Sequence, residues 1–135
     1  MYLRGGPVKK TKVLVIAASL RIGGAEKVAR DIALYASAGQ YEFHYIVFGD
    51  EIGAYESRLQ ERGCTIFHLA EPSDGYSHFL KELWKLMKTH RYDVIHAHNM
   101  FNCGWTMLLA ACAGVSVRVA HSHSALDDGN SAIKW

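Results

Sequence analysis

The chain has 135 residues, half of them hydrophobic, and a formal net charge of +2, a composition typical of a single globular domain. The charge is too small to indicate a nucleic-acid partner, and no apolar run approaches the roughly 18 residues that cross a bilayer. Residues 1–11 lack the apolar stretch of a signal peptide and are predicted to form a flexible leader. Cys64, Cys103 and Cys112 stand apart among apolar residues, so we expect reduced thiols in the core.

Strands and helices alternate along the chain. The first strand is predicted at residues 12–18, where an unbroken β-branched run is typical of a strand buried on both faces of a parallel sheet. A helix follows, and six apolar residues are predicted to form its inner face: Ala25, Val28, Ala29, Ile32, Tyr35 and Ala36. The later elements are expected at residues 42–48 (strand), 54–62 (helix), 64–69 (strand), 76–90 (helix), 93–97 (strand), 102–113 (helix) and 117–121 (strand). The alternation predicts an α/β fold, with a doubly wound parallel sheet of five or more strands and helices on both faces.

The longest predicted helix, at residues 76–90, has an apolar and a basic side. Its apolar residues are predicted to face the core: Phe79, Leu80, Leu83, Leu86 and Met87. Lys81, Lys85 and Lys88 fall on the other side, which we interpret as a solvated face. Docking of these lysines on an anionic membrane is the alternative.

The ligand site of a doubly wound sheet lies beyond the carboxyl ends of the strands, where the strand order reverses. With right-handed crossovers and the order 3-2-1-4-5, the first and fourth strands are neighbours at that point. Three polar loops are therefore expected to meet in one crevice: residues 19–26, 98–100 and 121–124.

Gly23 and Gly24 precede the first helix. Small residues there let a ligand approach the free amides of the first turn, which favour an anion such as a phosphate. A tight turn that needs glycine for its dihedral angles explains the pair equally well. Residues 22–27 lack the GxGxxG spacing of a dinucleotide site. For Glu26, in the same turn, we favour an interaction with the helix dipole over a hydrogen bond to a sugar hydroxyl.

Four histidines form two His-x-His pairs, His96 with His98 and His121 with His123. Residues two apart in a strand share a face, so each pair is expected on one side of the sheet. His96 and His121 fall inside the predicted strands and are interpreted as core residues. His98 and His123 follow the strands and are interpreted as site residues.

The two pairs also fit a metal site on neighbouring strands. Because the only nearby carboxylates are Asp127 and Asp128, we expect no metal. A metal-dependent hydrolase that uses these pairs is nevertheless one alternative function. A non-catalytic, Rossmann-like nucleotide-binding domain, with Asp50 contacting a ribose, is another, although the missing third glycine counts against it.

The sequence resembles the N-terminal domain of the family 4 (group 1) glycosyltransferases, which have the GT-B fold. The resemblance rests on three motifs, each at the expected strand: residues 23–26 (GGAE), 93–99 (DVIHAHN) and 118–124 (RVAHSHS). It covers residues 12–124 and is closest to members that build bacterial exopolysaccharide, capsule or lipopolysaccharide.

The resemblance implies two Rossmann-like domains that face each other across a cleft. Residues 12–135 would be the N-terminal, acceptor-side domain, incomplete at its C-terminal end. The implied reaction is retaining transfer of a sugar from a nucleotide diphosphate-sugar to a saccharide or lipid-linked acceptor. The implied location is cytoplasmic, with peripheral contact at the inner face of the membrane, and no cofactor or nucleic acid is expected.

The family also implies roles for individual residues. Gly23 and Gly24 would lie near the donor diphosphate and the acceptor, in the loop that contains Glu26. His123 would be the catalytic residue that contacts the transferred sugar, and His98 and Asn99 would line the acceptor side.

One family feature is missing from this sequence. The pair of glutamates separated by seven residues, which in the family lies in the C-terminal domain and binds the nucleotide-sugar, does not occur. We therefore expect the isolated chain to be inactive, although the full-length form would be a glycosyltransferase of the hexosyltransferase type.

Overall fold

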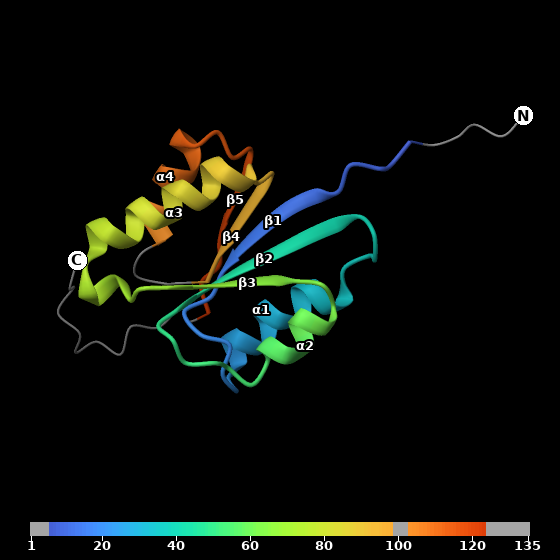
Figure 1. Cartoon of the computed structure of the whole chain (residues 1–135), viewed down its shortest axis with the longest axis horizontal. Coiled ribbons are helices and arrows are strands. Elements are labelled where there is room, and N and C mark those ends of the chain that lie inside the picture. The colour runs from blue at the N-terminus through green and yellow to red at the C-terminus, as the bar shows by residue number, and fades with distance from the viewer. Residues whose placement is uncertain (1–5, 99–102, 124–135) are drawn as a thin grey trace, which may run out of the picture.

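The computed structural model describes residues 6–98 and 103–123. Its centre is a five-stranded sheet in the order β3-β2-β1-β4-β5, with every strand pair parallel (Figure 1). The elements in chain order are β1 (Thr11–Ile16), α1 (Gly24–Tyr35), β2 (Tyr41–Phe48), α2 (Glu56–Glu61), β3 (Thr65–Leu69), the 3₁₀ turn η1 (Pro72–Asp74), α3 (Tyr76–His90), β4 (Val94–Ala97), α4 (Cys103–Cys112) and β5 (Val117–Ala120). The predicted fold class and strand order are confirmed, and the order in which the strands are added reverses between β1 and β4.

Helices cover both faces of the sheet (Figure 1). On one face, α1 and α2 pack through Ala29, Ala33 and Leu59 against Val13 and Val15 of β1. On the other face, α3 and α4 pack against alternate residues of the same strands, and the contacts include Leu14, Ile16, Ile95, Phe79, Leu83, Met87 and Ala110. β1 is therefore buried on both faces of the sheet, as its continuous apolar run predicted.

The inner face of α1 is narrower than predicted. Ala29 and Ala33 are buried, whereas the side chains of Val28 and Tyr35 are exposed (40% and 82%). At roughly 100° per residue, Val28 and Tyr35 lie about 100° and 120° around the helix from Ala29. They therefore fall outside the stripe that touches the sheet, and small alanines make the contact instead.

The two sides of α3 are those predicted. Phe79, Leu83 and Met87 are buried, and Leu80 and Leu86 pack at the edge of the same cluster. Lys81, Lys85 and Lys88 are exposed. No helix within residues 6–98 and 103–123 is long and apolar enough to span a membrane.

The cysteines differ in burial. Cys64 is buried and Cys103 is partly buried, as expected of core thiols, but Cys112 is exposed. The prediction for Cys112 is wrong because this residue lies at the outer side of α4, where Trp105 and Leu108 are exposed too.

Candidate functional site

The candidate site lies at the carboxyl ends of β1, β4 and β5. Ile16 pairs with Ala97, and Ala97 pairs with Ala120. The backbone ladder continues for one residue beyond the strands, since the amide of His98 donates to the carbonyl of Ile16 and that of His121 to the carbonyl of Ala97, both over 2.8 Å. The loops after β4 and β5 therefore begin side by side, as predicted.

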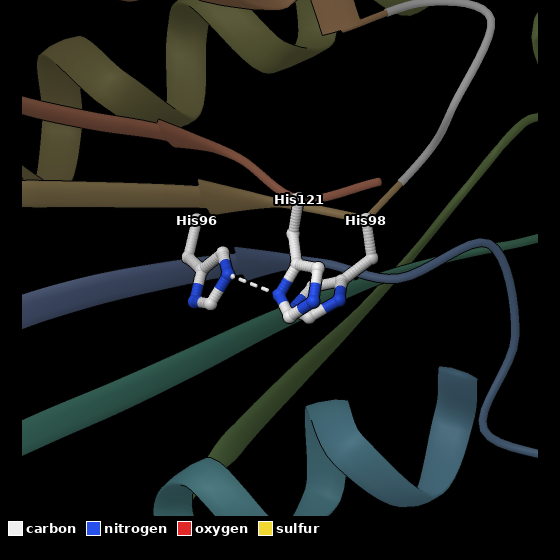
Figure 2. A group of neighbouring side chains, drawn as sticks. All are labelled: His96, His98 and His121. Carbon is white, nitrogen blue, oxygen red and sulfur yellow. Dashed lines mark hydrogen bonds between the residues drawn. The ribbon is translucent and has the colours of Figure 1, made fainter. Parts of the chain in front are cut away.

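The four histidines of the His-x-His pairs project from the same face of the sheet. His96 pairs in register with Val15 of β1 and with Val119 of β5. Since paired residues of neighbouring strands point to the same side, and side chains alternate along each strand, His98, His121 and His123 share the side of His96. Figure 2 shows the imidazoles of His96, His98 and His121 on this side, which is the side covered by α1.

These side chains form a compact group that we call the histidine cluster (His96, His98, His121 and His123). The distance from His96 Nε2 to His121 Nδ1 is 3.1 Å (Figure 2), and that from His98 Nδ1 to His123 Nε2 is 2.7 Å. The rings also stack within each pair, with centroids 4.3 Å apart for His96 and His98 and for His121 and His123. The sequence predicted the shared face but not these contacts between the strands.

The burial of the cluster differs from the prediction. His98 is 8% exposed, whereas His96, His121 and His123 are only partly buried. The placement of His121 inside its strand and in the core was wrong, because β5 ends at Ala120 and all four of its residues are exposed. β5 is the last strand of the sheet, so no further strand among the described residues covers its outer edge.

His96, His98 and His123 favour the neutral form of the imidazole. Burial lowers the pKa of His98 to about 3, and the neighbouring histidines add to this shift. Burial likewise lowers the pKa of His96 and of His123, although the carboxylate of Glu26 opposes the shift at His123. A neutral imidazole carries one N–H donor and one acceptor nitrogen, so each close pair forms a single hydrogen bond. Glu26, in the first turn of α1, is thus within electrostatic reach of His123.

Gly23 and Gly24 lie at the N-terminus of α1, with Gly23 as the N-cap. Neither glycine has a positive φ angle, and Gly23 is extended, with φ −171° and ψ 167°. The explanation that a turn needs glycine for its dihedral angles is therefore not supported. A Cβ added to Gly24 would meet no atom within 4 Å, so this position leaves open space above the helix start.

Glu26 folds back over the same turn. A Cβ added to Gly23 would lie 2.2 Å from Glu26 Oε2, and Glu26 Oε1 accepts a hydrogen bond of 3.1 Å from the Ser19 hydroxyl. The N-cap makes no side-chain hydrogen bond, and the first helical backbone bond runs from the amide of Lys27 to the carbonyl of Gly23. The preceding amides of the first turn are therefore directed toward the crevice.

A hydrogen-bonded pair of a buried glutamate and a partly exposed histidine supports this edge of the sheet, and the sequence did not reveal it. Glu56, which is 3% exposed, accepts a 2.9 Å hydrogen bond from the amide of Gly53 and lies 3.0 Å from His68 Nε2. His68 Nδ1 lies 2.8 Å from the carbonyl oxygen of Gly49, and these contacts raise the pKa of His68. The sequence shows only a glutamate in a short helix and a histidine in a strand, with nothing to pair them.

Gly53 holds the loop after β2 against the loop after β1. A Cβ at Gly53 would lie 2.4 Å from the carbonyl carbon and oxygen of Leu20, and the amide of Tyr55 donates to that carbonyl over 3.0 Å. Of the remaining predicted residues, Asp50 is exposed after β2, and Asn99 lies outside the described residues.

Comparison with known proteins identifies relatives for most of the chain. The sequence profile of Glycosyltransferase Family 4 matches residues 22–135. The chain is 28% identical over 117 residues to the putative glycosyltransferase EpsF of Bacillus subtilis (strain 168). It is 28% identical over 116 residues to CapH, a capsular polysaccharide biosynthesis glycosyltransferase of Staphylococcus aureus.

These matches cover 84% and 86% of this chain but only 30% and 32% of EpsF and CapH. The chain thus spans about a third of the length of these relatives. Among solved structures, Anabaena HepE in complex with UDP has a similar fold, with a TM-score of 0.61 and 21% identity over 91% of this chain and 32% of HepE.

The parallel sheet, the reversal of its strand order between β1 and β4, and this structural likeness define a Rossmann-like half of the GT-B glycosyltransferase fold. Since the family profile matches more than half of the sequence, the chain belongs to Glycosyltransferase Family 4.

Proposed function

We propose that residues 12–135 form the acceptor-side domain of a retaining glycosyltransferase. The full-length enzyme would transfer a sugar from a nucleotide diphosphate-sugar to a saccharide or lipid-linked acceptor during synthesis of a cell-surface polysaccharide. The observation that supports this most is that the loop from β1 to the start of α1 and the histidine cluster leave the carboxyl ends of neighbouring strands, where the strand order reverses. In doubly wound folds this point is where ligands bind.

The start of α1 is suited to the donor diphosphate. Its first amides carry the positive end of the helix dipole and have no side-chain cap, so they favour a phosphate oxygen. The open space at Gly24 lets the ligand reach the backbone. The leaving diphosphate needs such dipoles as charge develops on it in the transition state.

Glu26 and His123 are assigned to the sugar rather than to the diphosphate. A carboxylate repels phosphate but accepts hydrogen bonds from hydroxyls, and Glu26 already accepts one from Ser19. His123 lies near Glu26, and its neutral imidazole has both a donor and an acceptor for a sugar hydroxyl. His98, through its bond to His123, and Asn99 are assigned to the acceptor side.

The comparisons favour this function over the two alternatives. The family match and the relatives EpsF and CapH, both named as glycosyltransferases, do not fit a hydrolase or a passive nucleotide-binding domain. CapH is named for capsular polysaccharide synthesis, and HepE was solved with UDP. These names support a polysaccharide product and a uridine nucleotide among the donors to test first.

The test uses the full-length protein that contains this domain. It is incubated with UDP- and GDP-sugars and with saccharide and lipid-linked acceptors from a producing strain, and the products are analysed by mass spectrometry and NMR. We expect transfer from one donor class with an anomeric configuration equal to that of the donor. Inversion would refute the retaining mechanism, and donor hydrolysis without transfer at any acceptor would refute the proposed function.

A further inference from the structure

The histidine cluster has a chemical property that sugar transfer does not require. His96, His98 and His121 each present a ring nitrogen, and these three nitrogens lie within 4.8 Å of one another (Figure 2). We propose that these three imidazoles form a binding site for a divalent transition-metal ion of the zinc class. The proposal shares His98 with the proposed acceptor side, but it concerns metal binding, which is measured without any transferase activity.

An unpaired polar atom in the cluster points to a ligand. His98 is 8% exposed, and its Nε2 is buried with no hydrogen-bond partner in the described part of the chain. A buried polar atom without a partner destabilises the folded state, and a ligand bound to that atom removes the penalty. His98 Nδ1 is already bonded to His123, so a ligand at Nε2 would satisfy the ring completely. A hydrogen bond to the other ring nitrogen is also what orients a metal-binding histidine.

The distances fit a tetrahedral ion after small movements. Zn–N bonds of about 2.0–2.1 Å place two ligand nitrogens about 3.3 Å apart. His96 Nε2 and His121 Nδ1 are already 3.1 Å apart and share a hydrogen bond. An ion that replaces this proton needs both nitrogens as lone-pair donors, so the donating ring moves its proton to its other nitrogen. The remaining distance to His98, at most 4.8 Å, is closed by rotation of the partly buried His96 and His121 side chains, while the bond to His123 holds the His98 ring.

The electrostatic setting also favours coordination. Metals bind the neutral form of imidazole, and burial lowers the pKa of His96 and His98. Three nitrogen ligands and no described carboxylate among them select Zn²⁺, Cu²⁺ or Ni²⁺ over Mg²⁺ and Ca²⁺, which require oxygen ligands. The fourth position would be left to a water or to a ligand in the crevice.

The experiment titrates the chelator-treated 135-residue chain with Zn²⁺ by calorimetry and with Co²⁺ by electronic absorption. We expect one equivalent of Zn²⁺ and the intense visible bands of tetrahedral Co²⁺, with no heat from Mg²⁺. The variants His96→Ala and His121→Ala should each weaken Zn²⁺ binding by at least about tenfold. Since both side chains are only partly buried, the variants should keep the far-UV circular dichroism of the parent.

The matched control is His78→Ala on α3. His78 lies 3.5 Å from Glu82, four residues later on an exposed helix face, and this pair offers a histidine and a carboxylate away from the cluster. Zinc binding that survives His121→Ala but is lost in His78→Ala would overturn the proposal. If either cluster variant fails to fold, paramagnetic Co²⁺ shifts of the histidine ring signals in the unsubstituted chain decide the question. Signals of His96, His98 and His121 that stay unshifted would then refute it.

Discussion

His98 Nδ1 lies 2.7 Å from His123 Nε2, and the two rings are stacked with centroids 4.9 Å apart. The bond joins the end of β4 to the segment after β5. His98 is buried and fixed by the sheet, whereas His123 is partly exposed. His98 therefore positions the imidazole that the proposed function assigns to the sugar.

His123→Ala should separate chemistry from folding. In the full-length enzyme we expect turnover to fall about a hundredfold, which is typical for the loss of one hydrogen bond made in the transition state. The melting temperature should fall only slightly, because the removed side chain is partly exposed and water can take its place as the partner of His98 Nδ1. His98→Ala should in contrast cost about 1–3 kcal/mol of unfolding free energy, because it empties a buried position.

His78→Ala serves as the control for this pair, since His78 is exposed on α3, and should change neither quantity. If His123→Ala kept its turnover, or lost as much stability as His98→Ala, His123 would have a structural role and no role in the reaction.

The glycines at the two loops should respond in opposite ways to substitution by alanine. Gly24→Ala introduces a methyl group into open space at a helix position without positive φ, so the domain should be as stable as before or gain a few tenths of a kcal/mol. Gly53→Ala forces a methyl group to 2.4 Å from the Leu20 backbone and should cost about 1–3 kcal/mol. Thermal unfolding of both variants measures this difference.

If the first turn of α1 binds the donor diphosphate, Gly24→Ala should still raise the KM for the nucleotide-sugar in the full-length enzyme. A Gly24→Ala enzyme with unchanged kinetics would remove the proposed contact, whatever its stability.

The sequence predicted the strand order and the crevice because these depend on local patterns and general rules. β-branched runs mark β1 and β2, helical periodicity marks α3, and right-handed crossovers then determine which strands are neighbours. The residues that leave β1, β4 and β5 could be placed together on that basis alone.

The contacts between side chains from different strands could not be predicted in this way. The bonds of His96 to His121 and of His98 to His123 depend on the register of β4 with β5, which no local pattern encodes. The exposure of His121 depends on β5 being the last described strand. The pairing of Glu56 with His68 depends on how α2 packs on β3, and no motif spans the 12 positions between them.

The isolated 135-residue chain should bind nucleotide-sugars poorly. In the proposed function the crevice supplies one wall of a cleft, and the glutamate pair that the family uses for the donor does not occur in this sequence. Calorimetry with a panel of UDP- and GDP-sugars should give dissociation constants weaker than about 1 mM, equivalent to less than about 4 kcal/mol of binding free energy. Micromolar binding would contradict the assignment of this chain to the acceptor side.

The lysine face of α3 should not bind membranes by itself. Lys81, Lys85 and Lys88 are exposed, and Lys88 lies over the ring of Trp84, 5.4 Å from its centroid. The apolar side of this helix packs in the core. Only three lysines and one partly exposed indole therefore remain to contact a membrane. Sedimentation with anionic vesicles should show no binding that depends on salt. Binding that disappears in the triple Lys→Glu variant would instead assign this face to the membrane.

The His68–Glu56 pair should make the stability of the domain depend on pH near neutrality. Hydrogen bonding to the Gly49 carbonyl and then to Glu56, with the charges of Glu56 and Asp50, raises the pKa of His68 above its usual 6.5. The folded state therefore binds the proton more tightly than the unfolded state. The stabilisation is fully present below pH 6.5 and is lost as the pH rises through the higher folded pKa.

We expect the difference in unfolding free energy between the parent chain and His68→Gln to be larger at about pH 5.5 than at about pH 8.5. Histidines whose pKa is lowered by folding, such as His44 and His98, destabilise both proteins equally in acid. Their contribution therefore cancels when the two unfolding free energies are subtracted. Urea unfolding at a series of pH values measures it, with His78→Gln as the control that should show no such trend. A difference that stays constant across this range would mean that His68 acts only through neutral hydrogen bonds, and one that grows with pH would reverse the assigned direction of its pKa shift.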